Sequence, residues 1–222
     1  MAIMQSKNLP RPPHNPYVRD LVQSKRARSR SISHEALLKG FTGWRENGYL
    51  PHRDEPDLTQ FITFRLNDAF PSELRHEWEC LLEIEEDRKR LIELERYLDR
   101  GRGKCYLRDA RIAAIVENSL LFGGRRFYDL KSWVIMPNHV HVLVDIDEVP
   151  LAKIVQGWKS YTAKEANKLL KRRGEFWQDG YWDTYMRDTS HESKTVRYIE
   201  NNPLKAKLAR VPGAWPFSSA RF

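Results

Sequence analysis

Valine, isoleucine and leucine dominate the stretch from Trp133 to Asp145, and polar residues flank it, so the pattern predicts buried strands. Pro137-Asn138 interrupts the stretch, and because proline has no N–H for the ladder, we expect a break or turn there. Beyond the break, His139 and His141 are two residues apart. Side chains alternate between the faces of a strand, so both imidazoles are expected on one face and the neighbouring valines on the other.

The same periodicities predict the other elements. Strands are expected over residues 60–66, 125–135, 139–145 and 181–186, and helices over 72–100, 109–120, 150–173 and 191–201. Apart from the long helix at 72–100, the order is strand, helix, strand, strand, helix, strand, helix. This order fits an α+β layer with a mostly antiparallel sheet, as in ferredoxin-like folds.

The first 55 residues are poor in periodic hydrophobic positions; four prolines lie within residues 10–16, and the basic run SKRARSRSIS follows from Ser24. Two interpretations stay open: a solvated, disordered tail, or a basic arm that docks on phosphates, with Arg26 and Arg28 as candidate contacts. Aromatic residues around 43–52 look more ordered, because they need somewhere to pack. We therefore expect a basic, partly disordered extension over 1–55 and one domain over 56–222.

Composition points to a polyanionic partner. The 222-residue chain has a formal net charge of +8 and a pI near 9.5, a balance typical of proteins that bind nucleic acid. Residues 72–100 are net −4, so the rest of the chain carries +12. One side of the predicted 150–173 helix is rich in basic residues and is a candidate phosphate track, with these positions as DNA contacts: Lys159, Lys164, Lys168, Arg172 and Arg173.

Cysteine content and apolar run length argue against other classes. Cys80 and Cys105 are the only cysteines and form no CxxC spacing, which argues against a disulfide framework or a cysteine zinc site. No apolar run approaches the length of a membrane span. The N-terminus lacks a signal-peptide pattern, so we expect a cytoplasmic protein without membrane association.

A second stretch, YIENNP from Tyr198 to Pro203, supplies candidate chemistry. On a helix, Tyr198 and Asn202 share a face about 6 Å apart. The Asn202 carbonyl oxygen suits a hard cation, and a phenol beside a metal-bound phosphate can attack a phosphodiester. Because Pro203 disfavours helical geometry before it, we expect Asn202 at a fraying helix end.

Taken singly, these residues leave the reaction open. Two histidines on a strand are more often a packed or exposed pair than a metal site, and a tyrosine like Tyr198 is more often part of a core. The other five histidines, His52 among them, have no comparable partner motif, and we expect them to be structural or solvated.

Together, however, MPNHVH at 136–141 and YIENNP at 198–203 resemble the single-tyrosine His-hydrophobe-His transposases, specifically the REP-associated tyrosine transposases of bacteria. Other segments match in the same order over residues 43 to 222: FITFRL from 61, CYLRD from 105, WKSYT from 158, FWQ from 176 and WPFSS from 215. The resemblance implies a ferredoxin-like α+β fold with the histidines on a central strand and the tyrosine on the last helix. It makes 56–222 a transposase-like catalytic domain, with a helical insertion at about 72–103.

The resemblance also implies a reaction: metal-dependent cleavage and strand transfer of single-stranded DNA at REP-type hairpins. His139, His141 and Asn202 would hold Mg²⁺ or Mn²⁺, and Tyr198 would form a 5′-phosphotyrosine link and release a 3′-hydroxyl. Arg187 matches a charged position of the family, which implies a structural or DNA-orienting role. Coordination needs neutral imidazoles, so activity should fall in acid.

Two other functions remain open. One is a hairpin-binding regulator that does not cut, although the four intact site residues argue against it. The other is a metal-dependent nuclease that uses water, in which Tyr198 is dispensable. The expected partner in each case is single-stranded or hairpin DNA in the bacterial nucleoid, and both a monomer and a homodimer fit the sequence.

Overall fold

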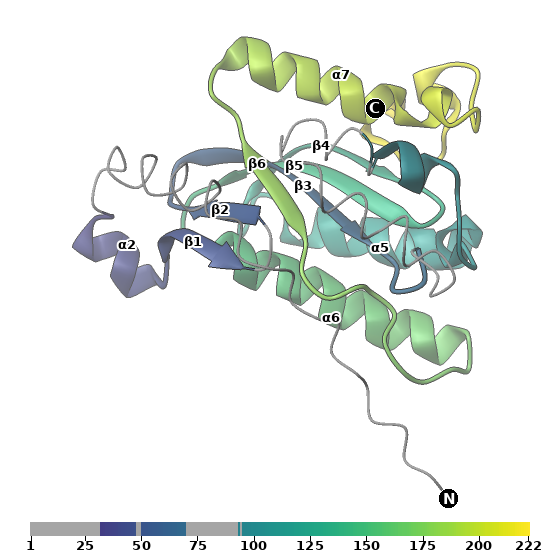
Figure 1. Cartoon of the computed structure of the whole chain (residues 1–222), viewed down its shortest axis with the longest axis horizontal. Helices are drawn as coiled ribbons and strands as arrows, with labels where there is room; N and C mark the ends of the chain where they lie inside the picture. Colours follow the sequence, from purple (N-terminus) through teal and green to yellow (C-terminus); the bar gives the residue numbers. More distant parts are fainter. Residues whose placement is uncertain (1–31, 48–49, 70–92, 94) are drawn as a thin grey trace, which may run out of the picture.

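A computed structural model describes residues 32–47, 50–69, 93 and 95–222. At its centre is a four-stranded antiparallel sheet with the order β4-β5-β3-β6 (Figure 1). The strands are β3 (Leu58–Arg65), β4 (Asp129–Ile135), β5 (His139–Ile146) and β6 (Trp182–Tyr185). The α+β fold predicted from the element order, with its antiparallel sheet, is confirmed.

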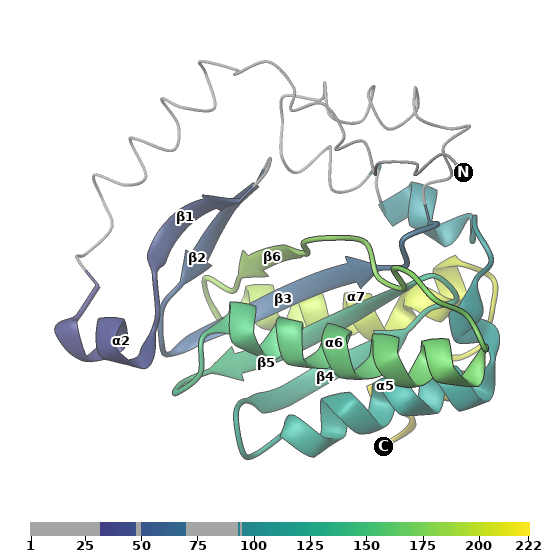
Figure 2. The same cartoon turned by 90° about the horizontal axis from the view of Figure 1, so that it is seen from below.

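Helices cover both faces of this sheet. Helices α5 (Ala110–Gly123) and α6 (Leu151–Leu169) lie on one face, and α7 (Thr189–Lys205) lies on the other (Figures 1 and 2). Alternation along β5 explains the arrangement, because Val140, Val142 and Val144 belong to the larger core. Leu143 joins Phe61 and Ile199 in a smaller core beneath α7. The histidine face of β5 is therefore the face that α7 covers.

Part of the predicted N-terminal extension is ordered. Helix α2 (His34–Lys39) precedes a hairpin of β1 (Gly43–Asn47) and β2 (Leu50–Asp54). The strands account for the order expected around residues 43–52, except at 48–49, which lie outside the described residues. Strand β2 contacts β6 at the edge of the main sheet. The basic run with Arg26 and Arg28 and most of the predicted 72–100 helix lie outside the described residues, although residues 95–99 are helical. The division into domains at residue 55 stays a prediction.

Several element ends differ from the prediction for local reasons. Strand β4 begins at Asp129, because residues 124–128 form a tight loop in which Arg125 has φ 64° and its N–H donates to the Tyr128 carbonyl. Helix α6 ends at Leu169, shortly before Lys171 with φ 51°. The break at Pro137-Asn138 is confirmed as the turn between β4 and β5.

The C-terminal segment lies along β4. Its short 3₁₀ helices, η3 (Pro212–Ala214) and η4 (Ser219–Arg221), flank a stretch in which the Phe217 carbonyl accepts from the Ile135 N–H. The Trp215 indole donates to the Ile135 carbonyl at 2.9 Å. A third 3₁₀ turn, η2 (Tyr106–Arg108), precedes α5. In the part of the chain that is described, no helix has the length and apolar character needed to span a membrane.

Candidate active site

The two histidines of β5 converge on one point. The Nε2 atoms of His139 and His141 are 3.1 Å apart, and both side chains are buried. In the antiparallel register His141 pairs with Thr63 on β3, and His139 pairs with Arg65. This arrangement confirms that both imidazoles share one face of the strand. Two lone pairs at that separation repel each other unless a proton or a cation lies between them.

Each imidazole is held through its other nitrogen. His139 Nδ1 lies 2.8 Å from the Asn138 side-chain oxygen, and His141 Nδ1 lies 2.8 Å from the Thr63 hydroxyl. The Asn138 oxygen can only accept, so His139 carries its proton on Nδ1 and exposes the lone pair of Nε2. Such second partners fix the tautomer and ring direction of histidines that bind metals.

Burial keeps both imidazoles neutral. Loss of solvent, with a smaller contribution from the Arg65 charge, lowers the pKa of His139 to about 3. Burial also lowers the pKa of His141 well below its usual value, and the neighbouring His139 and Lys205 act in the same direction. Neutral imidazole is the form that binds a metal ion. The pair is therefore ready to bind a cation at neutral pH.

Asn202 supplies an amide without a partner. Its side chain is completely buried, and neither Oδ1 nor Nδ2 has a hydrogen-bond partner among the described residues. A buried amide left unpaired costs about 1–3 kcal/mol, so such groups usually have a reason to persist. Its carbonyl oxygen can be a ligand for a hard cation such as Mg²⁺ or Mn²⁺. Two convergent imidazoles and this amide thus fit the divalent ion that the family resemblance implies.

Within the described residues, the histidine pair does not form part of a larger cluster of ionisable metal ligands. Among residues 32–47, 50–69, 93 and 95–222, no group of three or more His, Cys, Asp or Glu side chains is placed to hold a metal ion. A cation at the histidine pair therefore depends on an oxygen such as that of Asn202 for its third ligand.

Tyr198 lies one helical turn before Asn202 and packs against the histidines. Its ring centroid is 5.6 Å from that of His141 and 5.9 Å from that of Phe61, which stacks on His141. The predicted fraying of the helix at Asn202 is wrong, because α7 continues through Pro203 to Lys205. The Asn202 and Pro203 carbonyls accept from later N–H groups, which closes the helix end. Tyr198 and Asn202 consequently share the helix face that meets β5.

Three charged groups surround the Tyr198 phenol. The Lys205 ammonium lies 4.0 Å from the ring centroid. The Glu95 and Asp99 carboxyl groups act on the hydroxyl through their charges. Burial is the largest cause that raises the pKa of Tyr198, and the two carboxyl groups act in the same direction. The phenol is therefore fully protonated at neutral pH.

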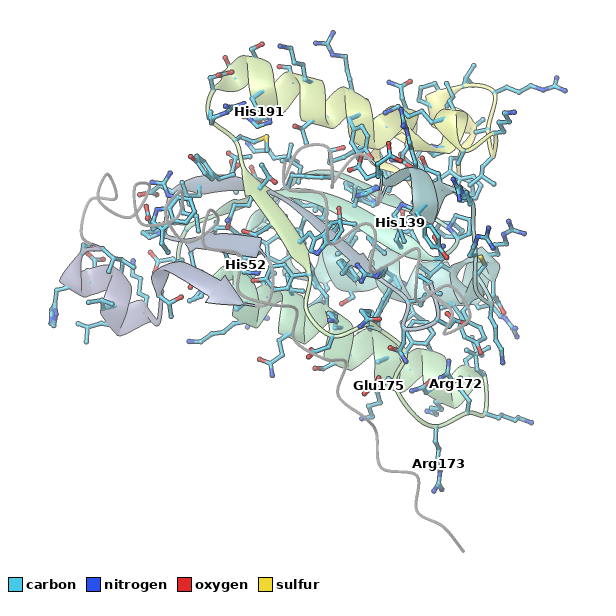
Figure 3. The ribbon with its side chains drawn as sticks, viewed as in Figure 1. His52, His139, Arg172, Arg173, Glu175 and His191 are labelled. Atoms are coloured by element: carbon cyan, nitrogen blue, oxygen red, sulfur yellow. The ribbon has the colours of Figure 1, made fainter. Side chains whose placement is uncertain are left out.

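Two predicted DNA contacts on the 150–173 segment bond to the protein itself. The Lys159 ammonium donates to the carbonyl oxygens of Gln178 and Gly180, at 2.7 and 2.8 Å. Arg172 donates to the Glu175 carbonyl at 2.9 Å, near the loop that follows α6 (Figure 3). Both side chains hold the 172–180 loop in place, and their contact with DNA stays a prediction.

The remaining predicted contacts within the described residues are exposed: Lys164, Lys168, Arg173 and Arg187. Helix α6 lies on the opposite face of the sheet from α7 (Figure 1). Lys164 and Lys168, which lie on α6, therefore do not line the site around Tyr198. A phosphate track along them stays a prediction.

His52 has a partner that the sequence did not reveal. Its Nδ1 bonds to the Asp183 carboxylate, and Gln60 donates to the other Asp183 oxygen at 3.2 Å. Figure 3 shows His52 well apart from His139. The buried pair joins β2 to β6, which confirms the structural role expected for His52.

Sequence reasoning missed the residues that orient the histidines. Asn138 was read only as part of a chain break, yet its amide bonds to His139 and to the Arg102 carbonyl. Thr63 gives no signal of its own, since only the strand register places it opposite His141. Glu95 and Asp99 belong to the net-acidic segment 72–100, and the sequence gives no sign that they approach Tyr198. Their approach to Tyr198 depends on tertiary packing, which the hydrophobic periodicity of the sequence does not predict.

Comparisons with known proteins agree with this geometry. Residues 124–202 match the sequence model of the family described as "Transposase IS200 like". Over 94 residues, the chain is 24% identical to the REP-associated tyrosine transposase of Escherichia coli K12. The aligned residues make up 42% of this chain and 55% of that protein. This match thus spans about half of the relative's length.

A solved structure of a REP-associated tyrosine transposase bound to a REP hairpin is also similar. It is 17% identical, with a TM-score of 0.48, over 81% of this chain and 82% of that chain. The sequence match over residues 124–202 contains the histidine pair, Tyr198 and Asn202. The resemblance predicted from the two motifs is therefore confirmed, and this chain is similar to the IS200-like transposases and to their REP-associated tyrosine members.

Proposed function

We propose that this protein cleaves and rejoins single-stranded DNA at REP-type hairpins through a covalent link to Tyr198. The observation that carries the proposal is the convergence of His139 and His141, with Nε2 atoms 3.1 Å apart, beside Tyr198. The unpaired Asn202 amide supports a metal ion at this point.

His139, His141 and Asn202 are the residues that would hold Mg²⁺ or Mn²⁺. A bound divalent ion polarises a phosphate and offsets the charge that develops on it. Asn138 and Thr63 fix the two imidazoles so that the ligand atoms need no rearrangement. Burial excludes water around the pair, which strengthens every charge interaction there.

Tyr198 is the proposed nucleophile. Its attack on the scissile phosphorus forms a 5′-phosphotyrosine link and releases a 3′-hydroxyl. The link conserves the energy of the broken phosphodiester, so a 3′-hydroxyl from the same or another strand can reverse the reaction. Lys205, over the Tyr198 ring, stabilises negative charge on the phenol oxygen as the link breaks.

The experiment is a denaturing gel with labelled single-stranded REP-hairpin DNA and Mg²⁺. We expect the wild type to form a protein–DNA adduct and Tyr198→Phe to form none. Tyr161→Phe is the matched control, because this tyrosine is 55% exposed on α6 and should leave the adduct unchanged.

Two outcomes would replace the proposal. Cutting without an adduct, equal in wild type and Tyr198→Phe, would identify a nuclease that uses water. Hairpin binding without cutting of any strand would identify a regulator.

A further inference from the structure

The connection between α5 and β4 exposes two phenylalanine rings. Its sequence from Phe122 to Phe127 is FGGRRF, and we call it the FGGRRF loop. Phe122 is 74% exposed on the last turn of α5, and Phe127 is 39% exposed. The Phe127 N–H donates to the Gly123 carbonyl at 3.0 Å, so the loop folds back on the end of the helix. Neighbouring Leu121 is also exposed. Single exposed apolar side chains are ordinary, whereas a group of them indicates a binding surface.

The shape of the FGGRRF loop is fixed from below. The Arg125 N–H donates to the Tyr128 carbonyl at 2.8 Å, with Arg125 at φ 64°. Buried Tyr128 donates its hydroxyl to the Leu120 carbonyl and accepts from the Trp158 indole. A non-glycine residue at positive φ costs free energy and persists where its surroundings impose it, as at ligand sites. The exposed rings are therefore presented on a preorganised loop.

The charge of the FGGRRF loop is positive and available. Arg125 and Arg126 are both exposed, and the Arg126 guanidinium lies 5.1 Å from the Phe127 ring centroid. The carboxylates that flank the loop in the sequence, Glu117 and Asp129, already pair with other cations. Within the described residues, neither arginine of the loop has an ion-pair partner. The apolar surface is thus bordered by two positive charges that suit an anionic ligand.

Exposed rings next to arginines suit single-stranded nucleic acid. Unpaired bases stack on aromatic rings, and guanidinium groups bind phosphates and stack on rings as well. Paired bases in a duplex keep their faces covered, so a duplex offers nothing to the rings. A second copy of the chain fits the loop less well. A symmetric contact places the same patch on both copies, and the two arginines would then meet their own equivalents.

The FGGRRF loop lies away from the candidate active site. Strand β4 begins directly after the loop at Asp129, which pairs with Asp145 near the end of β5 (Figure 2). Six residues of β5 separate Asp145 from His139, a distance of about 20 Å along the strand. Helix α5 also lies on the sheet face opposite α7 (Figure 1). DNA bound on the loop is therefore outside the nucleotides that react at Tyr198.

We propose that the FGGRRF loop is a second binding site for single-stranded DNA, in which Phe122 and Phe127 stack on unpaired bases while Arg125 and Arg126 bind phosphates. The inference rests on the function proposed above for the kind of ligand, and it extends that function to DNA that flanks the cleaved nucleotides. The loop holds this flanking DNA without taking part in the chemistry.

The test measures the Kd for a labelled 20-nucleotide oligothymidine by fluorescence anisotropy. Stacking on a ring tolerates any sequence, so this probe needs no particular hairpin. Phe122→Ala should weaken binding by at least about 5-fold, the lower end of what one stacked base contributes. Leu38→Ala is the matched control, because Leu38 is 76% exposed on α2 and its loss should leave the Kd unchanged.

The salt dependence of the same Kd tests the arginines. Each phosphate contact on single-stranded DNA contributes about 0.7 to the slope of log Kd against log salt concentration. The double variant Arg125→Gln with Arg126→Gln should therefore reduce that slope by about 1.4. Arg111→Gln is the control, because Arg111 is exposed at the start of the same helix and its guanidinium is already bound by Asp109. Its slope should equal that of wild type.

Ultraviolet cross-linking identifies direct contact. Thymines of the bound probe should become attached to Phe122 or Phe127, as located by mass spectrometry of the digested protein. An unchanged Kd in Phe122→Ala, or cross-links only at other residues, would overturn the role of the loop. A lower melting temperature in Phe122→Ala would overturn it too, because the ring would then pack on the protein itself.

Sedimentation without DNA tests the other occupant. A wild-type dimer that Phe122→Ala converts to a monomer would overturn the DNA site, because a second copy would then cover the loop. The proposed function fails separately from this inference. Oligothymidine binding that depends on the loop, in a wild type that forms no adduct with hairpin DNA, would overturn the proposed reaction and support the second site.

Discussion

Asn138 and Asn202 form a pair that tests whether the Asn202 amide is kept for a metal ion. Both side chains are completely buried. Asn138 bonds to His139 and to the Arg102 carbonyl, whereas neither polar atom of Asn202 has a partner among the described residues. Leucine matches asparagine in its number of side-chain heavy atoms. Asn→Leu at each position therefore removes the amide with a small change in packing.

The two substitutions should have opposite effects on the metal-free protein. Because an unpaired buried amide costs about 1–3 kcal/mol, Asn202→Leu should raise the free energy of unfolding by about that amount. The melting temperature should rise by about 2–4 °C for each kcal/mol in a chain of this size. Asn138→Leu strands a buried nitrogen of His139 and should lower the free energy of unfolding by about 1–3 kcal/mol.

Urea unfolding in the presence of EDTA measures both changes in the free energy of unfolding. The same experiment with Mn²⁺ in place of EDTA measures how much stability each protein gains from the metal ion. Wild type should gain stability with Mn²⁺ because the ion binds only the folded protein, and Asn202→Leu should gain much less. A loss of stability in Asn202→Leu comparable to that in Asn138→Leu would refute the reasoning, since it would mean that the Asn202 amide is already satisfied within the protein.

Three further predictions concern the same region. The pKa of His139 is lowered to about 3 in the folded protein and is near 6.5 in the unfolded protein, so between these values the unfolded state binds more protons. The free energy of unfolding in EDTA should therefore fall as pH drops from about 6.5, and in His139→Gln it should fall less steeply, by up to about 1.4 kcal/mol per pH unit. An identical pH dependence in wild type and variant, measured by urea unfolding, would contradict this origin. Thr63→Val should weaken Mn²⁺ binding by about 10–100-fold in calorimetry, because it removes the partner of an imidazole, while Thr59→Val, whose hydroxyl bonds to a distant carboxylate, should leave it unchanged. Gly103→Ala should lower the melting temperature, because Gly103 has φ 83° and an added Cβ would lie 2.4 Å from the Asp68 carbonyl oxygen; an unchanged melting temperature would show that this turn relaxes at no cost.

The sheet, and the packing of helices on both of its faces, were predictable because the two faces of a strand give an alternating pattern of residues in the sequence. Alternation along β5 separated the histidines from the valines, and the proline between the strands marked the turn. Helix α5 begins close to its predicted start, and there the Asp109 carboxylate accepts from the Arg111 N–H. These features depend on neighbours within a few residues, which is the range that periodicity and capping describe.

The hairpin of β1 and β2 was only partly predictable. Trp44 packs edge-on against Tyr185, and Arg53 lies 4.7 Å from the Tyr185 ring centroid, so the hairpin is held by partners more than a hundred residues away. Contacts between residues so far apart in the chain leave no periodic pattern in the local sequence, so they could not be predicted from it.

The site divides in the same way. Motif order predicted a site of His139, His141, Tyr198 and Asn202, and the structure brings Tyr198 against His141. The approach of Glu95 to Tyr198 was missed because an acidic residue on an exposed helix and one near a buried phenol look alike in the sequence. The continuation of α7 past Pro203 was also missed, since packing against β5 outweighs the local bias against helix before a proline.

The most direct measurement is mass spectrometry of the protein–DNA adduct after digestion with trypsin and nuclease. The account predicts a single modified peptide, with a nucleotide joined through its 5′-phosphate to Tyr198. Cleaved DNA with every tyrosine unmodified, or a nucleotide on a different residue, would contradict the claim that this tyrosine carries the strand between cleavage and rejoining.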